Sequence, residues 1–225
     1  MVFKNEMRLW RKLSITGLIG VVVYILFIIV GSFLWRGYNH ITQTISELTG
    51  FGVPGANINL LFSMISGSLQ IVFACTVLII FRLQKLKSLV IIGALLLLLT
   101  EIASFVSLCI VRLHLLGLLI TPDNIMHLVT TGIMLICSVG SGFCIGFGLR
   151  KTVDYKTIGN FTLCCAVIIA IFGLLLPVSM FGQLFITGLI ERIHTLTLEA
   201  WIAVISIYLY RKNDLKQRPL LSGKL

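Results

Sequence analysis

Charged side chains are scarce in this sequence. Asp, Glu, Lys and Arg make up 12% of its 225 residues and hydrophobic residues make up 58%, whereas soluble proteins carry roughly 25% charged residues. A soluble fold of this length would need more polar surface than the sequence supplies, but a helix bundle in a bilayer can turn apolar side chains outward to lipid. The composition therefore excludes a soluble domain and predicts an integral membrane protein, in line with a mean hydropathy of +1.06.

Cysteine pairs with metal-ligand spacing are also missing. None of the six cysteines belongs to a C-x-x-C pair, and all six lie within long apolar runs. A disulfide framework or a cysteine zinc site is therefore not expected. Buried cysteines of this kind pack as small hydrophobic side chains.

Long apolar runs occur six times. Each is long enough to cross a hydrocarbon core of roughly 30 Å, which takes about 20 helical residues. The sequence therefore predicts an all-α, polytopic membrane bundle of about six transmembrane helices, forming one domain over residues 1–225. The predicted spans are residues 13–35, 58–81, 88–111, 124–149, 158–180 and 187–210.

The basic residues predict the orientation of this bundle. Fifteen of the 18 Lys and Arg residues fall before the first span, in the second-to-third and fourth-to-fifth links, and in the tail. An even number of spans places these groups on one side, which the positive-inside rule assigns to the cytoplasm. We therefore expect a multi-pass protein of the cell membrane with both termini cytoplasmic. Because the net charge of +10 lies in short blocks rather than in a basic domain, no nucleic-acid partner is expected.

The link between the first two spans, residues 36–57, is the longest outer link. It contains Thr44-Ile45-Ser46-Glu47-Leu48 and then Gly50-Phe51-Gly52-Val53-Pro54-Gly55. The second piece matches G-x-G-x-x-G, but no strand precedes it, so a dinucleotide site is not indicated. A glycine-rich turn that folds the link back over the bundle is the preferred interpretation.

Small residues recur at helical spacing in the fourth span. Ser138, Gly142 and Gly146 stand at successive i+4 steps. This pattern predicts a ridge where another helix packs closely, with a polar cavity lining as the alternative.

Two acidic residues are expected near the middle of the membrane. Glu101 lies near the centre of the third span and Glu199 near the centre of the sixth. An ionisable group at that depth costs about 2.5–3.5 kcal/mol, so such groups usually face the bundle interior and are paired or functional. Arg192 lies seven residues before Glu199 on the same helix face, so a structural ion pair between them, or between Arg192 and Glu191, is one interpretation.

Two acid–histidine pairs predict a possible metal site. Asp123 and His127 are four residues apart and Glu191 and His194 are three apart, so each pair can converge on a point. If the fourth and sixth spans are neighbours, all four could bind zinc or another divalent metal, which could activate water against a lipid ester or amide. In the alternative interpretation Asp123 caps its helix and the histidines are hydrogen-bonded.

Several of these residues carry a resemblance to a known family. The Thr44–Leu48 segment with its glycine-rich turn, His127 opening a middle span, and Gly188-Leu189-Ile190-Glu191-Arg192-Ile193 leading to Trp201 resemble the bacterial membrane-protein family known as domain of unknown function 998. The resemblance covers nearly the whole chain. It implies a six-helix protein of unassigned activity, distantly similar to the Frag1/DRAM/Sfk1 proteins, some of which are connected with lipid remodelling or organisation. The positions that it marks as functional or architectural are Ser46, Glu47, His127, Glu191 and Arg192.

Three function classes follow. The first, which we favour, is a membrane protein with an outer-leaflet polar pocket for a lipid headgroup or a membrane partner. In this class Arg192 and His127 would contact phosphate. Further candidate ligand-binding residues are Glu47, Glu101 and Glu199. The second is a metal-assisted lipid hydrolase using His127, His194, Asp123 and Glu191, with Ser46 as a less favoured nucleophile. The third is a small proton-coupled carrier using Glu101 and Glu199, which the apolar cytoplasmic halves of the spans disfavour. A homo-oligomer or a protein partner is compatible with each.

Overall fold

Six helices of the computed structural model, which describes residues 2–114 and 121–212, are long and apolar enough to cross a membrane. The predicted all-α bundle of six spans is therefore confirmed, and the described residues form no strand beyond an isolated bridge between Phe51 and His114. A short helix α1 (Val2–Leu13) leads into the first span. The six long helices are α2 (Ile15–Leu34), α3 (Ala56–Leu83), α4 (Ser88–Phe105), α5 (Pro122–Arg150), α6 (Lys156–Phe181) and α7 (Thr187–Arg211).

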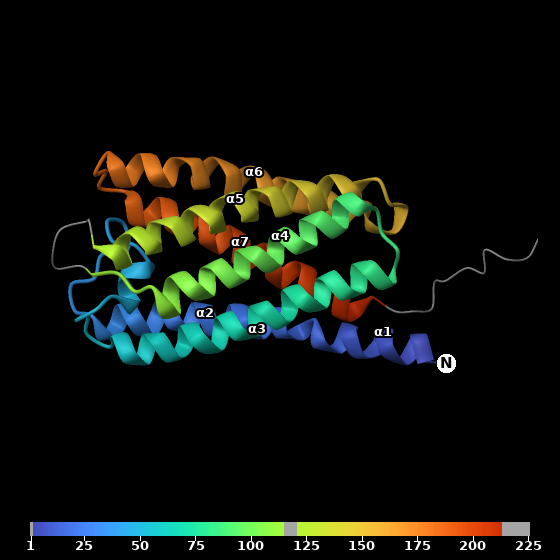
Figure 1. The fold of residues 1–225 in the computed structure, drawn as a ribbon, viewed down its shortest axis with the longest axis horizontal. Coiled ribbons are helices and arrows are strands. Elements are labelled where there is room, and N and C mark those ends of the chain that lie inside the picture. Colours follow the sequence, from blue (N-terminus) through green and yellow to red (C-terminus); the bar gives the residue numbers. More distant parts are fainter. Residues whose placement is uncertain (1, 115–120, 213–225) are drawn as a thin grey trace, which may run out of the picture.

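The long helices run along one common axis (Figure 1), and their contacts close a ring. Each helix from α2 to α6 packs against the next one along the chain, and α7 closes the ring by packing against both α6 and α2. Because successive helices are antiparallel, the starts of α2, α4 and α6 and the ends of α3, α5 and α7 share one end. We call this the basic end, since the Lys and Arg groups beside the spans lie there, and the opposite end the loop end.

Close packing at the basic half depends on small residues of α5. A Cβ atom placed on Gly142 would lie 2.7 Å from the Cβ of Ala166, and one on Gly146 would lie 2.7 Å from the side chain of Leu163. Both neighbours belong to α6, so these glycines let the two helices touch. The predicted small-residue ridge is thus a helix-packing surface.

The interior of the basic half is apolar. Phe73, Phe81, Trp201 and Ile202 are almost completely buried in one continuous cluster drawn from α3, α4, α5, α6 and α7. The indole N–H of Trp201 donates to the hydroxyl of Thr162 on α6 at 3.0 Å, so its one polar atom is satisfied.

The link between α2 and α3 folds back into the loop end, as the glycine-rich turn predicted. Its short 3₁₀-helix η1 (Ser46–Thr49) buries Leu48, which packs with Ile45 against Tyr24 and Phe27 of α2. The side chain of Asn59 then donates to the carbonyl of Leu48 at 2.8 Å. Residues 44–50 of the link therefore form a wall of the bundle, while residues 39–42 stay exposed.

Candidate ligand-binding pocket

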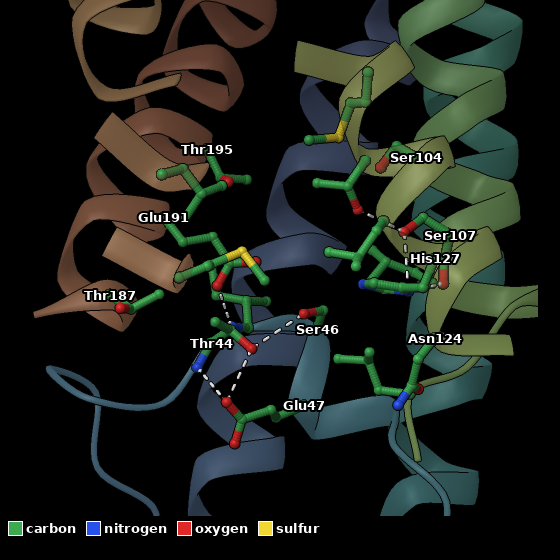
Figure 2. A pocket seen from close by; sticks show the side chains of 18 of the residues that line it. Thr44, Ser46, Glu47, Ser104, Ser107, Asn124, His127, Thr187, Glu191 and Thr195 are labelled. Atoms are coloured by element: carbon green, nitrogen blue, oxygen red, sulfur yellow. Dashed lines mark hydrogen bonds between the residues drawn. The ribbon is translucent and has the colours of Figure 1, made fainter. Parts of the chain in front are cut away.

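A pocket of about 450 Å³ lies at the loop end, between the folded link and the loop-end halves of α4, α5, α6 and α7 (Figure 2). Hydroxyl, amide, imidazole and carboxyl groups line one part of it, and leucine, methionine and phenylalanine side chains line the rest. The polar lining residues are Thr42, Thr44, Ser46, Glu47, Ser104, Ser107, His114, Asn124, His127, Thr131, Gln183, Thr187, Glu191 and Thr195, together with Tyr24.

The link wall is organised by Glu47. Its carboxylate accepts hydrogen bonds from the backbone N–H of Thr44 at 3.0 Å, from the Thr44 hydroxyl at 3.1 Å and from the side-chain amide of Gln43 at 3.1 Å. A Glu that reaches back to the N–H three residues earlier is half of a capping box, which the T-x-x-E spacing encodes. The Thr44 and Ser46 hydroxyls lie 3.1 Å apart, so the only hydrogen bond that Ser46 Oγ makes among the described residues is to another hydroxyl, not to a base.

Glu191 connects α7 to this wall. One of its carboxylate oxygens accepts from the backbone N–H of Ile45 at 2.5 Å, across 146 residues of sequence. Figure 2 shows Glu191 projecting from α7 toward Thr44 and Ser46. The link is therefore tied to α7 by a carboxylate that also lines the pocket.

Arg192, the next residue, points elsewhere. Its guanidinium donates to the carbonyls of Gln43 at 2.7 Å and Gly188 at 2.9 Å, and to the hydroxyl of Tyr38. The Tyr38 hydroxyl in turn donates to the carbonyl of Thr44 at 2.7 Å, and burial raises the pKa of this phenol although the guanidinium acts in the opposite direction. Arg192 therefore clamps the link from outside the pocket, and the expected ion pair with Glu199 and the expected contact with a ligand phosphate do not fit its position.

His127 of α5 stands on the opposite wall from Glu191. Its Nδ1 lies 2.9 Å from the carbonyl of Val111 and 3.1 Å from that of Ser107. These carbonyls are free because α4 ends in a single π-helical turn, η2 (Val106–Ile110), and the last carbonyls of a helix have no partner within it. An Nδ1 facing two carbonyls carries a proton, so when the ring is neutral its Nε2 is an acceptor.

Asp123 and His114 form the rim of the pocket. His114 Nε2 and the Asp123 carboxylate lie 2.9 Å apart, with the two side chains 38% and 55% exposed. The hydroxyl of Thr121, not Asp123, caps α5 by accepting from the N–H of Asn124 at 3.2 Å. The expectation that Asp123 caps this helix is wrong, because Asp123 lies inside the first turn instead of at the cap.

His194 does not face the pocket. It is fully buried against α6, where its Nδ1 lies 3.1 Å from the carbonyl of Ile169. The predicted quartet of Asp123, His127, Glu191 and His194 is therefore not assembled. Across residues 2–114 and 121–212, no group of three His, Cys, Asp or Glu residues could hold a metal ion.

Glu101 and Glu199 lie deeper in the bundle and do not line the pocket. Both are at least 96% buried; the amide of Gln70 donates to Glu199 at 2.6 Å, and one oxygen of Glu101 has no hydrogen bond among the described residues. The pocket-lining Ser104 lies one helical turn closer to the loop end than Glu101, and Thr195 lies one turn closer to it than Glu199. These acids therefore lie below the pocket floor.

The apolar side of the pocket reaches the outer surface of the bundle. Leu128 of α5 and Met180 of α6 line the pocket, yet they are 38% and 37% exposed. Leu184 and Phe185, which follow α6, also line it and are more exposed still. The pocket lining therefore reaches the outer surface of the bundle at the loop-end halves of α5 and α6.

Residues 18–208 match the family model described as "Protein of unknown function (DUF998)". The chain belongs to this family. It matches no curated protein and no solved structure. The distant similarity to the Frag1/DRAM/Sfk1 proteins stays a prediction.

The structure brings together part of what the DUF998 resemblance marked. Ser46, Glu47, His127 and Glu191 line one pocket, while Arg192 supports its wall from behind. Sequence reasoning missed Tyr38, Gln43 and Asn124. Tyr38 and the Gln43 carbonyl meet Arg192, which is distant in the chain, whereas the side chains of Gln43 and Asn124 bond to Glu47 and to the backbone of His114. The Thr44–Glu47 contact had a local signal, its capping-box spacing.

Proposed function

We propose that this DUF998 protein binds a membrane amphiphile, with the polar headgroup inside the pocket and the hydrocarbon tail passing between α5 and α6. The observation that carries the proposal is the division of one pocket into a polar inner part and an apolar part exposed on the lipid-facing surface. Ligand sites of this kind combine apolar walls with a few convergent polar groups that fix orientation.

The exposed apolar part of the pocket favours a ligand that arrives from the bilayer. Leu128 and Met180 belong to this part on α5 and α6, so a hydrocarbon tail placed there would exchange lipid contacts for protein contacts at little cost. The headgroup would meanwhile gain hydrogen bonds from groups such as Thr131 and Ser107 inside the bundle.

We also propose that the basic end faces the cytoplasm, which would place the pocket in the outer leaflet. The physical reason is the gathering of Lys and Arg at that end, as the positive-inside rule describes. The exposed Ile41 of the folded link offers a test. An Ile41→Cys variant should react with a membrane-impermeant maleimide added to intact cells, whereas the unmodified sequence, whose cysteines lie in the spans, should not.

Retention of lipid tests the proposed binding. Thr131 lines the pocket, so a Thr131→Trp variant would fill the headgroup space, whereas Ile133 lies on the same helix, is 46% exposed and does not line the pocket. After purification in a mild detergent, native mass spectrometry should find several-fold less bound lipid on Thr131→Trp than on Ile133→Trp. Equal retention by two variants with equal thermal unfolding midpoints would contradict the proposal.

A further inference from the structure

The charged groups of the pocket lining are mainly acidic. Its Glu and His residues are Glu47, Glu191, His114 and His127, Tyr24 adds a phenol, and no Lys or Arg among the described residues is part of the lining. Arg192, which follows the lining residue Glu191 in the sequence, donates its guanidinium hydrogen bonds to the backbone and to Tyr38. A phosphate or sulfate headgroup would therefore enter a pocket with two acids and no Lys or Arg to receive it.

The pocket offers acceptor atoms beside the hydroxyls that line it, and the first acceptor belongs to His127. Nδ1 of His127 is occupied by the carbonyls of Ser107 and Val111, while its Nε2 makes no hydrogen bond with any described residue. The side chain is 96% buried and lines the pocket. Figure 2 shows the imidazole directed toward the wall that carries Ser46 and Glu191.

Glu191 offers a second acceptor on the facing wall. Its Oε2 accepts from the N–H of Ile45 and the backbone of Ser46 also donates to this carboxylate, but each carboxylate oxygen has two lone pairs, so the group retains acceptor capacity. Glu47 has accepted three donors already and adds negative charge nearby. The ligand that complements these atoms carries hydrogen-bond donors and positive charge.

We infer that the pocket selects a primary ammonium headgroup, which donates to the Glu191 carboxylate and to His127 Nε2. This inference rests on the proposed function and adds the chemical class of the headgroup. A charge-assisted hydrogen bond to a carboxylate in a site shielded from water is about twice as strong as a neutral one. The ammonium therefore gains more from this pocket than an alcohol of the same size, and a phosphate is repelled by both acids.

Amphiphiles with one tail and different headgroups test the inference. The purified protein in neutral detergent would be titrated at neutral pH with dodecylamine, dodecanol and dodecyl phosphate, with affinity measured by native mass spectrometry. Dodecylammonium should bind roughly tenfold more tightly than the other two, as expected for one shielded charge-assisted contact. Glu191→Gln keeps an acceptor for the Ile45 N–H and should remove this preference.

Asp123→Asn is the matched control, because it neutralises an acid at the same end that does not line the pocket and should keep the preference. If Glu191→Gln fails to fold, Glu47→Gln replaces it, with a smaller loss of preference expected. Equal binding of all three amphiphiles, blocked by Thr131→Trp, would overturn the ammonium inference and leave the proposed pocket standing. Tighter binding of dodecyl phosphate would overturn it too, and no binding of any amphiphile would overturn the proposed function itself.

Discussion

The two ends of this bundle use the same six helices in different ways. In the basic half, Gly142 and Gly146 let α5 touch α6, and the interior is filled by apolar side chains around Trp201. At the loop end, partly exposed side chains of α5 and α6 line one side of a pocket and the folded link lines another. The difference teaches that the link at the loop end is held by specific polar partners, whereas the contact of α5 with α6 in the basic half depends on steric fit.

The clamp made by Arg192 should be the most sensitive point of the loop end. Replacing Arg192 with Met would leave the Gln43 and Gly188 carbonyls and the Tyr38 hydroxyl without their donor. Each hydrogen bond from a charged group contributes about 1.5–3 kcal/mol, so we expect a loss of roughly 3 kcal/mol or more. Thermal unfolding in detergent would measure it, and Arg192→Lys should lose less. A neutral effect of Arg192→Met would show that the link is not held in this way.

Glycines on α5 offer a matched test of steric fit. A Cβ on Gly142 would lie 2.7 Å from Ala166, whereas a Cβ on Gly132 of the same helix would meet nothing within 4 Å. Gly142→Ala should therefore destabilise the bundle by about 1–3 kcal/mol through overpacking. Gly132→Ala should instead stabilise it by roughly 0.5–1 kcal/mol, because alanine loses less backbone entropy in a helix. Unfolding midpoints that move in the same direction would contradict the difference between the two halves.

The buried acids Glu101 and Glu199 lie between the pocket and the basic half. Glu199→Leu would leave the amide of Gln70 unpaired in the interior and should cost about 1–3 kcal/mol. Glu199→Gln retains an acceptor and should cost clearly less. Comparing the unfolding midpoints of these two variants isolates the hydrogen bond, and equal losses would mean that Glu199 acts through its shape or its charge instead.

The rim pair should have the smallest effect. His114 and Asp123 are exposed, and an exposed ion pair contributes roughly 0–1 kcal/mol. Asp123→Asn should therefore leave the unfolding midpoint nearly unchanged. A loss as large as that of Arg192→Met would break the distinction between the buried clamp and the solvated rim.

Local sequence patterns were sufficient to predict the helices, and one of them encodes a turn of the link. The apolar runs are longer than a bilayer core requires, so their helical state and number follow from length and hydropathy alone. The i+4 spacing of Ser138, Gly142 and Gly146 likewise predicted a packing surface on α5. The T-x-x-E spacing encodes the Thr44–Glu47 contact, because the two residues are only three apart.

The long-range partners could not be derived in the same way. Asp123–His127 and Glu191–His194 have suitable helical spacing, but spacing on one helix does not fix which neighbour each side chain meets. In the structure His194 turns to α6, Asp123 turns to His114, and only Glu191 and His127 share the pocket. The expected metal site fails for this reason.

By itself, the sequence determined that this protein is a six-helix membrane bundle with its cations gathered at one end. The reason is that the cost of placing a segment in lipid depends on how many apolar and charged residues it contains and on their order along the chain. Only the tertiary structure decided that Arg192 supports the link while Glu191 and His127 face a common pocket. Those choices depend on how six helices rotate and pack against one another. Adjacent residues on one helix, such as Glu191 and Arg192, point in directions about 100° apart and so meet different neighbours.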